Sequence, residues 1–146
     1  MLSFLFSFSS LSRRLLFLVY LFLIIFLSLS SPSQFPKIIL FTGADKIIHL
    51  LMYAGLGWML MWAFYKEHLS KTIRVFLLLS VPIWGTLMEC LQLFMHQGRS
   101  FSWFDILANF VGAGIGVLVF TLQSLSKKGK TVQNMVNAYL MNWHQK

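Results

Sequence analysis

Charged residues are scarce in this chain of 146 residues, and acidic ones are the scarcest, with 4 Asp and Glu against 12 Lys and Arg. Charged residues make up 11% of the sequence and hydrophobic residues 58%, whereas a soluble domain has about a quarter charged residues. Because so few charges cannot cover a surface in water, we expect lipid to be the solvent, and the length allows one domain. The single cysteine, Cys90, excludes an intrachain disulfide and a cysteine-cluster metal site.

The basic excess, a formal net charge of +8, would indicate nucleic acid as the partner of a soluble protein. Here the basic residues cluster between apolar runs, where such residues set the orientation of a membrane protein. We therefore expect membrane lipids and no nucleic acid as partners.

Four apolar segments are long enough for a spanning helix, which needs about 20 mostly apolar residues. They cover residues 15–31, 47–65, 75–95 and 104–123. The short loops between them predict an all-α, four-transmembrane-helix bundle with antiparallel neighbours over residues 15–123. The first segment, preceded by Arg13 and Arg14, also resembles a secretory signal. Its apolar run is long for a signal, so we expect an uncleaved helix, and cleavage would leave the other three spans unchanged.

The basic residues predict the orientation. With both termini in the cytoplasm, nine basic residues lie on that side, and three, Lys37, Lys46 and Arg99, lie outside. Residues 1–14 are then a cytoplasmic N-terminus and residues 124–146 a basic cytoplasmic tail. Apolar residues of this tail at helical spacing predict a short amphipathic helix on the inner leaflet, with a loosely ordered tail as the alternative. These residues are Val132, Met135, Val136, Tyr139, Leu140 and Trp143.

Polar residues recur at helical spacing inside the apolar segments, and the predicted topology gathers them within a few turns of the outer membrane face. A charge deep in a spanning helix costs about 2.5–3.5 kcal/mol on insertion scales, so Glu89, the deepest of them, needs a partner within the bundle. The set consists of Asp45, His49 and Tyr53 on the second segment, Glu89, Gln92 and His96 on the third, Arg99 in the turn, and Asp105 and Asn109 on the fourth.

Each of these residues also has a structural explanation. Asp45, Arg99 and Asp105 fit solvated loop charges or helix N-caps. The two histidines fit interfacial positions, and Tyr53 fits a packing aromatic. For Glu89 the structural explanation is an intrahelical hydrogen bond, and it is the weakest of these explanations.

Small residues and tryptophans are expected to serve packing. Gly112 and Gly116 have the GxxxG spacing that lets helices approach closely. Pro82 removes a backbone hydrogen bond to Leu78 and predicts a bend that opens space under the polar residues. The tryptophans, Trp58, Trp62, Trp84 and Trp103, are expected to contact lipid or the interface.

The stretches "DKIIHLLMYAGLG" (45–57) and "ECLQLFMHQGRSFSWFDILANFVGAGIG" (89–116) resemble the VanZ-like family of small bacterial integral membrane proteins. The family pattern has Asp-Lys, His and Tyr on one helix, then Glu and Gln, Gly-Arg, and finally Asp, Asn and a glycine stripe. The turn here reads "MHQGR" where the family tends to carry a proline, which affects the shape of the loop. The matching positions are Asp45, Lys46, His49, Tyr53, Glu89, Gln92, Gly98, Arg99, Asp105, Asn109, Gly112 and Gly116.

The resemblance implies a multi-pass protein of the bacterial cytoplasmic membrane with a role in the cell envelope. The founding member is associated with resistance to the glycopeptide antibiotic teicoplanin, and most relatives have no assigned reaction. The resemblance therefore implies an architecture and supplies no substrate and no catalytic residue.

Three functions compete. The first is a protein that binds or modulates a lipid-linked or peptidoglycan-related ligand, with Lys46 and Arg99 on its anionic group, no cofactor and no resident metal. The second is an intramembrane acid–base enzyme, or one in which Asp45, His49, Glu89 and His96 hold a divalent metal. No GxSxG or HExxH motif supports it. The third is a transporter with Glu89 as a proton relay. The cytoplasmic halves of the segments offer it no polar path, and the oligomeric state stays open.

Overall fold

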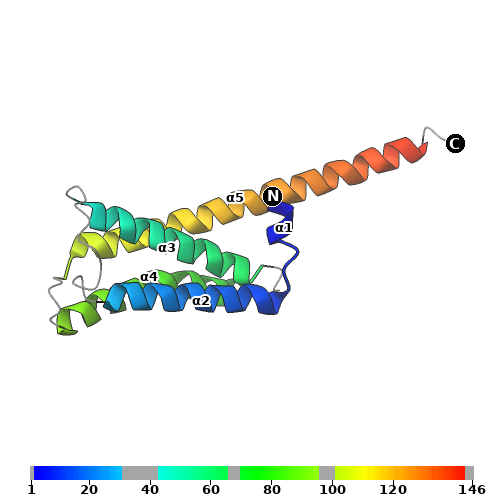
Figure 1. Ribbon diagram of the computed structural model, residues 1–146. Helices are drawn as coiled ribbons and strands as arrows, with labels where there is room; N and C mark the ends of the chain where they lie inside the picture. The colour runs from blue at the N-terminus through cyan, green and yellow to red at the C-terminus, as the bar shows by residue number, and fades with distance from the viewer. Residues whose placement is uncertain (1, 31–42, 66–69, 96–100, 144–146) are drawn as a thin grey trace.

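The computed structural model describes residues 2–30, 43–65, 70–95 and 101–143, and within these ranges the chain forms helices and no strand. The helices are α1 (Leu2–Leu5), α2 (Ser10–Leu29), α3 (Ala44–Ala63), α4 (Lys71–Met95) and α5 (Trp103–Trp143). Four of them, α2 to α5, are long and apolar enough to cross a membrane. They lie alongside one another as a bundle (Figure 1). The predicted all-α membrane fold is confirmed.

Side-chain caps extend two helices beyond their predicted starts. The Ser9 hydroxyl accepts a hydrogen bond from the backbone N–H of Ser12 at 3.1 Å, so α2 begins at Ser10 and includes both arginines. The Ser70 hydroxyl accepts from the N–H of Ile73 at 3.3 Å, and α4 begins at Lys71. Serine is a favoured N-cap because its oxygen satisfies one of the free N–H groups of the first turn.

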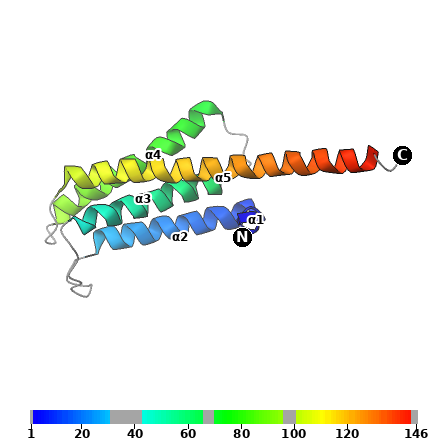
Figure 2. The same cartoon turned by 90° about the horizontal axis from the view of Figure 1, so that it is seen from above.

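The predicted C-terminal helix is present and is continuous with the fourth spanning helix. After residue 123, α5 contains one glycine and no proline, so nothing in its sequence interrupts the helix before Trp143. In both views this part of α5 projects beyond the other helices (Figures 1 and 2).

Helix α3 makes its most extensive contact with α5, because glycines let the two backbones meet. A Cβ atom at Gly57 would lie 2.6 Å from the carbonyl oxygen of Ala113. At Gly112 and Gly116 it would collide with the carbonyl oxygens of residues 50 and 54 of α3. Small residues permit such backbone contact between membrane helices.

Large apolar side chains on the outer surface of the bundle face away from the protein. Phe22, Leu51, Ile83 and Leu118 are each more than half exposed, as expected where lipid is the solvent. The first turns of α4 diverge from the α3–α5 pair (Figure 2), and its residues from Lys71 to Phe76 are all exposed. Tertiary contacts of α4 therefore concentrate in its second half.

We call the end of the bundle where α3 and α5 begin and α4 ends the polar end, and the opposite end the aromatic end. Helix α1, which the sequence did not predict, lies at the aromatic end (Figure 1). The indole N–H of Trp62 donates to the carbonyl of Leu5 at 2.9 Å, and Phe6 packs against Tyr65 with ring centroids 4.7 Å apart. Trp62 is buried, so its expected role as a lipid or interface contact is wrong.

Arg13, one of the nine basic residues expected on the cytoplasmic side, is also buried at the aromatic end. Its Nη2 donates to the Ser10 hydroxyl at 3.0 Å, and the guanidinium lies 5.9 Å from the centroid of the Tyr65 ring. The other two guanidinium nitrogens have no hydrogen bond within the described residues, which stop at Tyr65 and resume at Ser70.

Candidate functional site

Five polar side chains from three helices meet inside the polar end. We call them the polar cluster: His49 and Tyr53 on α3, Glu89 on α4, and Asp105 and Asn109 on α5. Four of the five are buried, and the side chain of His49 is 15% exposed. Because buried polar groups are costly without partners, the contacts inside the cluster decide what it can do.

Local sequence places each member. His49 and Tyr53 are one turn apart on α3, and Asp105 and Asn109 are one turn apart on α5, so each pair shares a helix face. Asp105 also lies in the first turn of α5, where a carboxylate is favoured by the helix dipole. Its backbone N–H donates to the Ser102 hydroxyl at 3.3 Å, which fixes this end of the helix.

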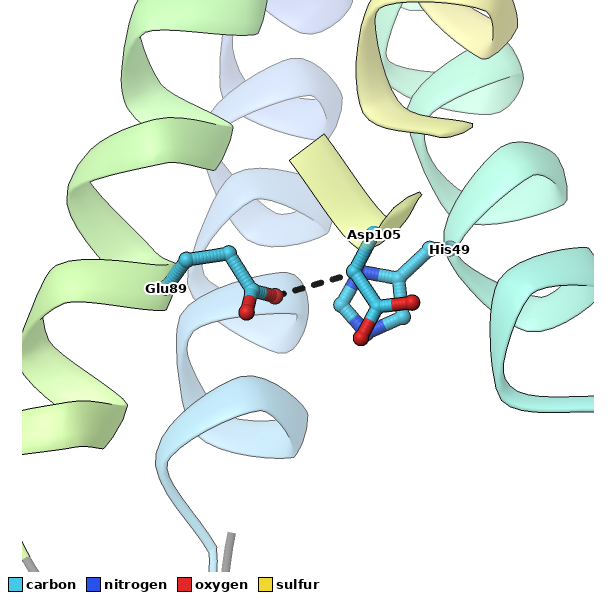
Figure 3. A group of neighbouring side chains, drawn as sticks. All are labelled: His49, Glu89 and Asp105. Carbon is cyan, nitrogen blue, oxygen red and sulfur yellow. Dashed lines mark ion pairs between the residues drawn. The ribbon is translucent and has the colours of Figure 1, made fainter. Parts of the chain in front are cut away.

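His49 is the centre of the cluster. Its Nδ1 lies 3.1 Å from Oδ1 of Asn109 and 3.7 Å from Oε1 of Glu89, so one imidazole links all three helices (Figure 3). Asp105 completes the group, since one ligand atom each from His49, Glu89 and Asp105 lie within 4.8 Å of one another. The cluster can therefore share protons or bind a cation.

Asp45 and Lys46 form the rim of the cluster. Lys46 Nζ lies 2.7 Å from Oδ2 of Asp45 and 3.8 Å from Oδ1 of Asp105. The side chains of Asp45 and Lys46 are 55% and 41% exposed, whereas Tyr53, two turns further along α3, is completely buried. Polar groups thus lead from the surface of the bundle into its interior, with the Lys46 ammonium group at the entrance.

Several buried polar atoms of the cluster have no hydrogen bond within the part of the chain that the structure describes. They are the hydroxyl of Tyr53, Oδ1 of Asp105 and Nδ2 of Asn109. More than nine in ten buried polar groups in proteins have a partner, and leaving one unsatisfied costs about 1–3 kcal/mol. Three such atoms in one cluster make it the candidate functional site of the described structure.

Gly85 of α4 lies against the cluster. A Cβ atom there would be 2.8 Å from Nδ2 of Asn109 and 2.8 Å from Cε1 of Tyr53. The bare backbone of Gly85 makes the room that these two side chains occupy. This is the region near Pro82 where the sequence predicted space under the polar residues.

One predicted site residue, Gln92, lies apart from the polar cluster. Gln92 is buried, but its amide donates to the carbonyl of Ser28 at 2.7 Å and so ties α4 to α2. Ser28 was not predicted as a site residue, since its sequence signal is no more than a small polar residue in the last turn of an apolar helix. Arg99, together with His96 and Gly98, lies outside the described residues.

Apolar packing separates the polar cluster from the aromatic end. Ile24, Leu56, Leu60, Val81 and Ala113 form a buried core together with the ring of Tyr53. Among the described residues, this core is apolar except for the Tyr53 hydroxyl, which argues against the transporter hypothesis.

The comparisons with known proteins give one match. A family model described as VanZ/LLP1 matches residues 2–124. The chain belongs to the VanZ/LLP1 family. The resemblance read from the sequence is confirmed. Searches of curated proteins and of solved structures found no match.

Family membership and four spanning helices together make this VanZ/LLP1 protein a multi-pass membrane protein. The matched region ends within α5 and includes every residue of the polar cluster. The C-terminal part of α5, which projects from the bundle, lies beyond the match.

Proposed function

We propose that this VanZ-like protein binds or modulates a cell-envelope ligand, lipid-linked or peptidoglycan-related, through the polar end of its bundle. The observation that carries the proposal is the series of polar groups along α3, from exposed Asp45 and half-buried Lys46 to buried Tyr53. An amphipathic ligand fits this arrangement, because Lys46 can contact an anionic headgroup while the apolar tail lies along the helices. In this proposal the protein contributes to glycopeptide resistance by acting on the envelope component that the antibiotic binds.

We also propose that the protein lies in the bacterial cytoplasmic membrane with its polar end outside the cytoplasm and both termini in the cytoplasm. The bias of basic residues supports this orientation. In a Cys90→Ser background, a cysteine at position 97, between α4 and α5, should react with an impermeant thiol reagent in intact cells. A cysteine at position 71, at the start of α4, should react only after lysis. The reverse pattern would put the polar end inside and end the proposal.

Ligand binding is tested by native mass spectrometry of the protein purified in a mild detergent. We expect the wild type to retain an envelope lipid and Lys46→Gln to lose most of it. Lys71→Gln removes an exposed charge at the start of α4 and should retain the lipid. Equal retention by the two variants would show that the polar end does not hold the ligand.

A second candidate is an intramembrane acid–base or metal-assisted enzyme acting on an envelope lipid. The specific observation in its favour is the contact between a histidine and a buried carboxylate, with His49 Nδ1 3.7 Å from Glu89 Oε1. Histidines and carboxylates within reach of a substrate are the usual general acids and bases. Incubating the protein with a lipid extract and following lipid masses over time separates the candidates, because only an enzyme changes them.

A further inference from the structure

The polar cluster contains a donor set that suits a metal ion. An imidazole nitrogen and two carboxylate oxygens, from His49, Glu89 and Asp105, lie within 4.8 Å of one another. Imidazole suits Zn²⁺ and related transition metals, whereas carboxylates also suit Mn²⁺. The sequence analysis expected no resident metal, and its metal alternative used Asp45 and His96 in place of Asp105.

We propose that His49, Glu89 and Asp105 bind one divalent cation of the Zn²⁺ or Mn²⁺ class. Charge balance is the first argument. Glu89 and Asp105 bring two carboxylates close together in an apolar bundle, where like charges repel strongly. Lys46, 3.8 Å from Asp105 Oδ1, also pairs with Asp45. A dication between the two carboxylates would replace their mutual repulsion with attraction to a shared charge.

The second argument is the support around the histidine. Asn109 is completely buried, and its Oδ1 lies 3.1 Å from His49 Nδ1. Histidines that bind metals almost always donate their other ring N–H to a nearby oxygen, which fixes the ring and its tautomer. Asn109 therefore holds the His49 ring beside the carboxylates, and the ring nitrogen that does not donate carries the lone pair that a cation needs.

Buried polar atoms give the third, independent argument. Asn109 Nδ2, Asp105 Oδ1 and the Tyr53 hydroxyl have no hydrogen bond within the described helices. Asp105 Oδ1 can bind the cation directly. The amide and the hydroxyl are available to a water or a ligand oxygen on the cation.

The geometry requires only small movements. Two ligands on opposite sides of a cation are at most about 4.2 Å apart at bond lengths near 2.1 Å, and the present ligand atoms lie within 4.8 Å. Three protein ligands leave a coordination position open, as in catalytic zinc sites. If the envelope ligand of the proposed function is anionic, its oxygen can take that position; this last step alone rests on the proposed function.

Equilibrium dialysis against Zn²⁺ or Mn²⁺, followed by elemental mass spectrometry, tests the site. The full-length protein, purified in detergent without a histidine tag, should bind one cation per chain. Glu89→Gln and Asp105→Asn should each weaken binding at least about tenfold, the effect typical of altered metal sites. Glu67→Gln, the matched change between α3 and α4, should bind as the wild type does. Folded wild type with no cation, or Glu89→Gln and Asp105→Asn variants that bind equally well, would overturn the site.

A variant that strengthens binding covers the case in which the cluster variants do not fold. Lys46→Met removes the positive charge beside Asp105 and should tighten cation binding by at least about threefold. Unchanged or weaker binding would contradict the proposal. The two proposals can fail separately. A protein that retains lipid but binds no metal would refute only the cation site. A protein that binds a cation but retains no lipid would refute only the envelope ligand.

Discussion

The two ends of the bundle bury different chemistry. At the aromatic end, Trp58 donates to Oε1 of Gln123 at 2.9 Å and Trp62 donates to Leu5, while the rings of Trp58 and Phe120 meet edge to face 5.8 Å apart. At the polar end, Tyr53 and Asn109 are just as buried, yet each keeps a polar atom without a hydrogen bond among the described residues. At the aromatic end such atoms belong to Arg13, whereas at the polar end they come from three described side chains that meet, Tyr53, Asp105 and Asn109.

The difference indicates which end has a purpose other than stability. Natural sequences satisfy buried polar groups where only folding is at stake, and exceptions concentrate at functional sites. Changes at the aromatic end should therefore alter stability alone. Changes at the polar end should alter binding more than stability.

The largest effect is expected where the two ends are joined, at the α3–α5 contact. Gly112→Leu places a side chain where the Leu50 carbonyl now lies and should force the helices apart. We expect the variant to disappear from the membrane fraction. Gly114→Leu is the matched control, because nothing lies within 4 Å of a Cβ atom there. Normal abundance and melting of Gly112→Leu would show that the two ends do not depend on this contact.

At the aromatic end, Trp62→Ala should destabilise the protein by about 3–5 kcal/mol, the usual cost of removing a buried aromatic side chain. The residue is 3% exposed, whereas Trp103 is 75% exposed and serves as the control. Thermal melting in detergent measures both variants. The lipid bound per folded protein should stay at the wild-type level in Trp62→Ala. A selective loss of lipid would mean that the aromatic end takes part in binding.

At the base of the polar end, Gly85→Ala should cost about 1–3 kcal/mol, because the new methyl group overlaps Asn109 and Tyr53. Relief of this overlap moves both side chains, so binding of lipid and cation should weaken more than stability does. Melting temperature and dialysis on the same preparation measure the two effects. Binding of lipid and cation at the wild-type level would show that Asn109 and Tyr53 do not contribute to the site.

How much of this comparison the sequence could predict depends on the kind of signal. Apolar length predicted the four spans, and helical spacing predicted that Asp45, His49 and Tyr53 share a face. Neither apolar length nor helical spacing predicts how each helix is rotated about its own axis relative to its neighbours. For that reason the sequence analysis could not foresee that Gln92 meets Ser28 of α2.

The aromatic end was harder to predict for a related reason. Residues 2–5 are too few for a periodic pattern, so helix α1 had no signal. Trp62 on an apolar helix looks the same whether lipid or protein surrounds it. Its burial depends on α1 and α5, which only tertiary structure brings together.

The smallest change in stability and the most specific change in function are expected at Glu89. Glu89→Gln keeps the size of the side chain and removes its charge, so the cost in stability should be about 1 kcal/mol or less. We expect normal abundance with loss of lipid retention and of any effect on teicoplanin susceptibility. Full retention in a normally folded Glu89→Gln protein would reduce Glu89 to a structural residue.

A double-mutant cycle then tests whether the polar cluster acts as one unit. His49 Nδ1 is 3.7 Å from Glu89 Oε1, and residues in contact typically show coupling energies of about 0.5–3 kcal/mol. Adding His49→Gln to Glu89→Gln should therefore weaken binding less than the two single effects combined. Sequence reasoning predicts the same coupling for Arg99→Ala. Lys71→Gln, remote from the cluster, should combine additively with Glu89→Gln. Additive effects of His49→Gln and Glu89→Gln would mean that the two residues contribute separately, because a shared ligand or cation couples every group that holds it.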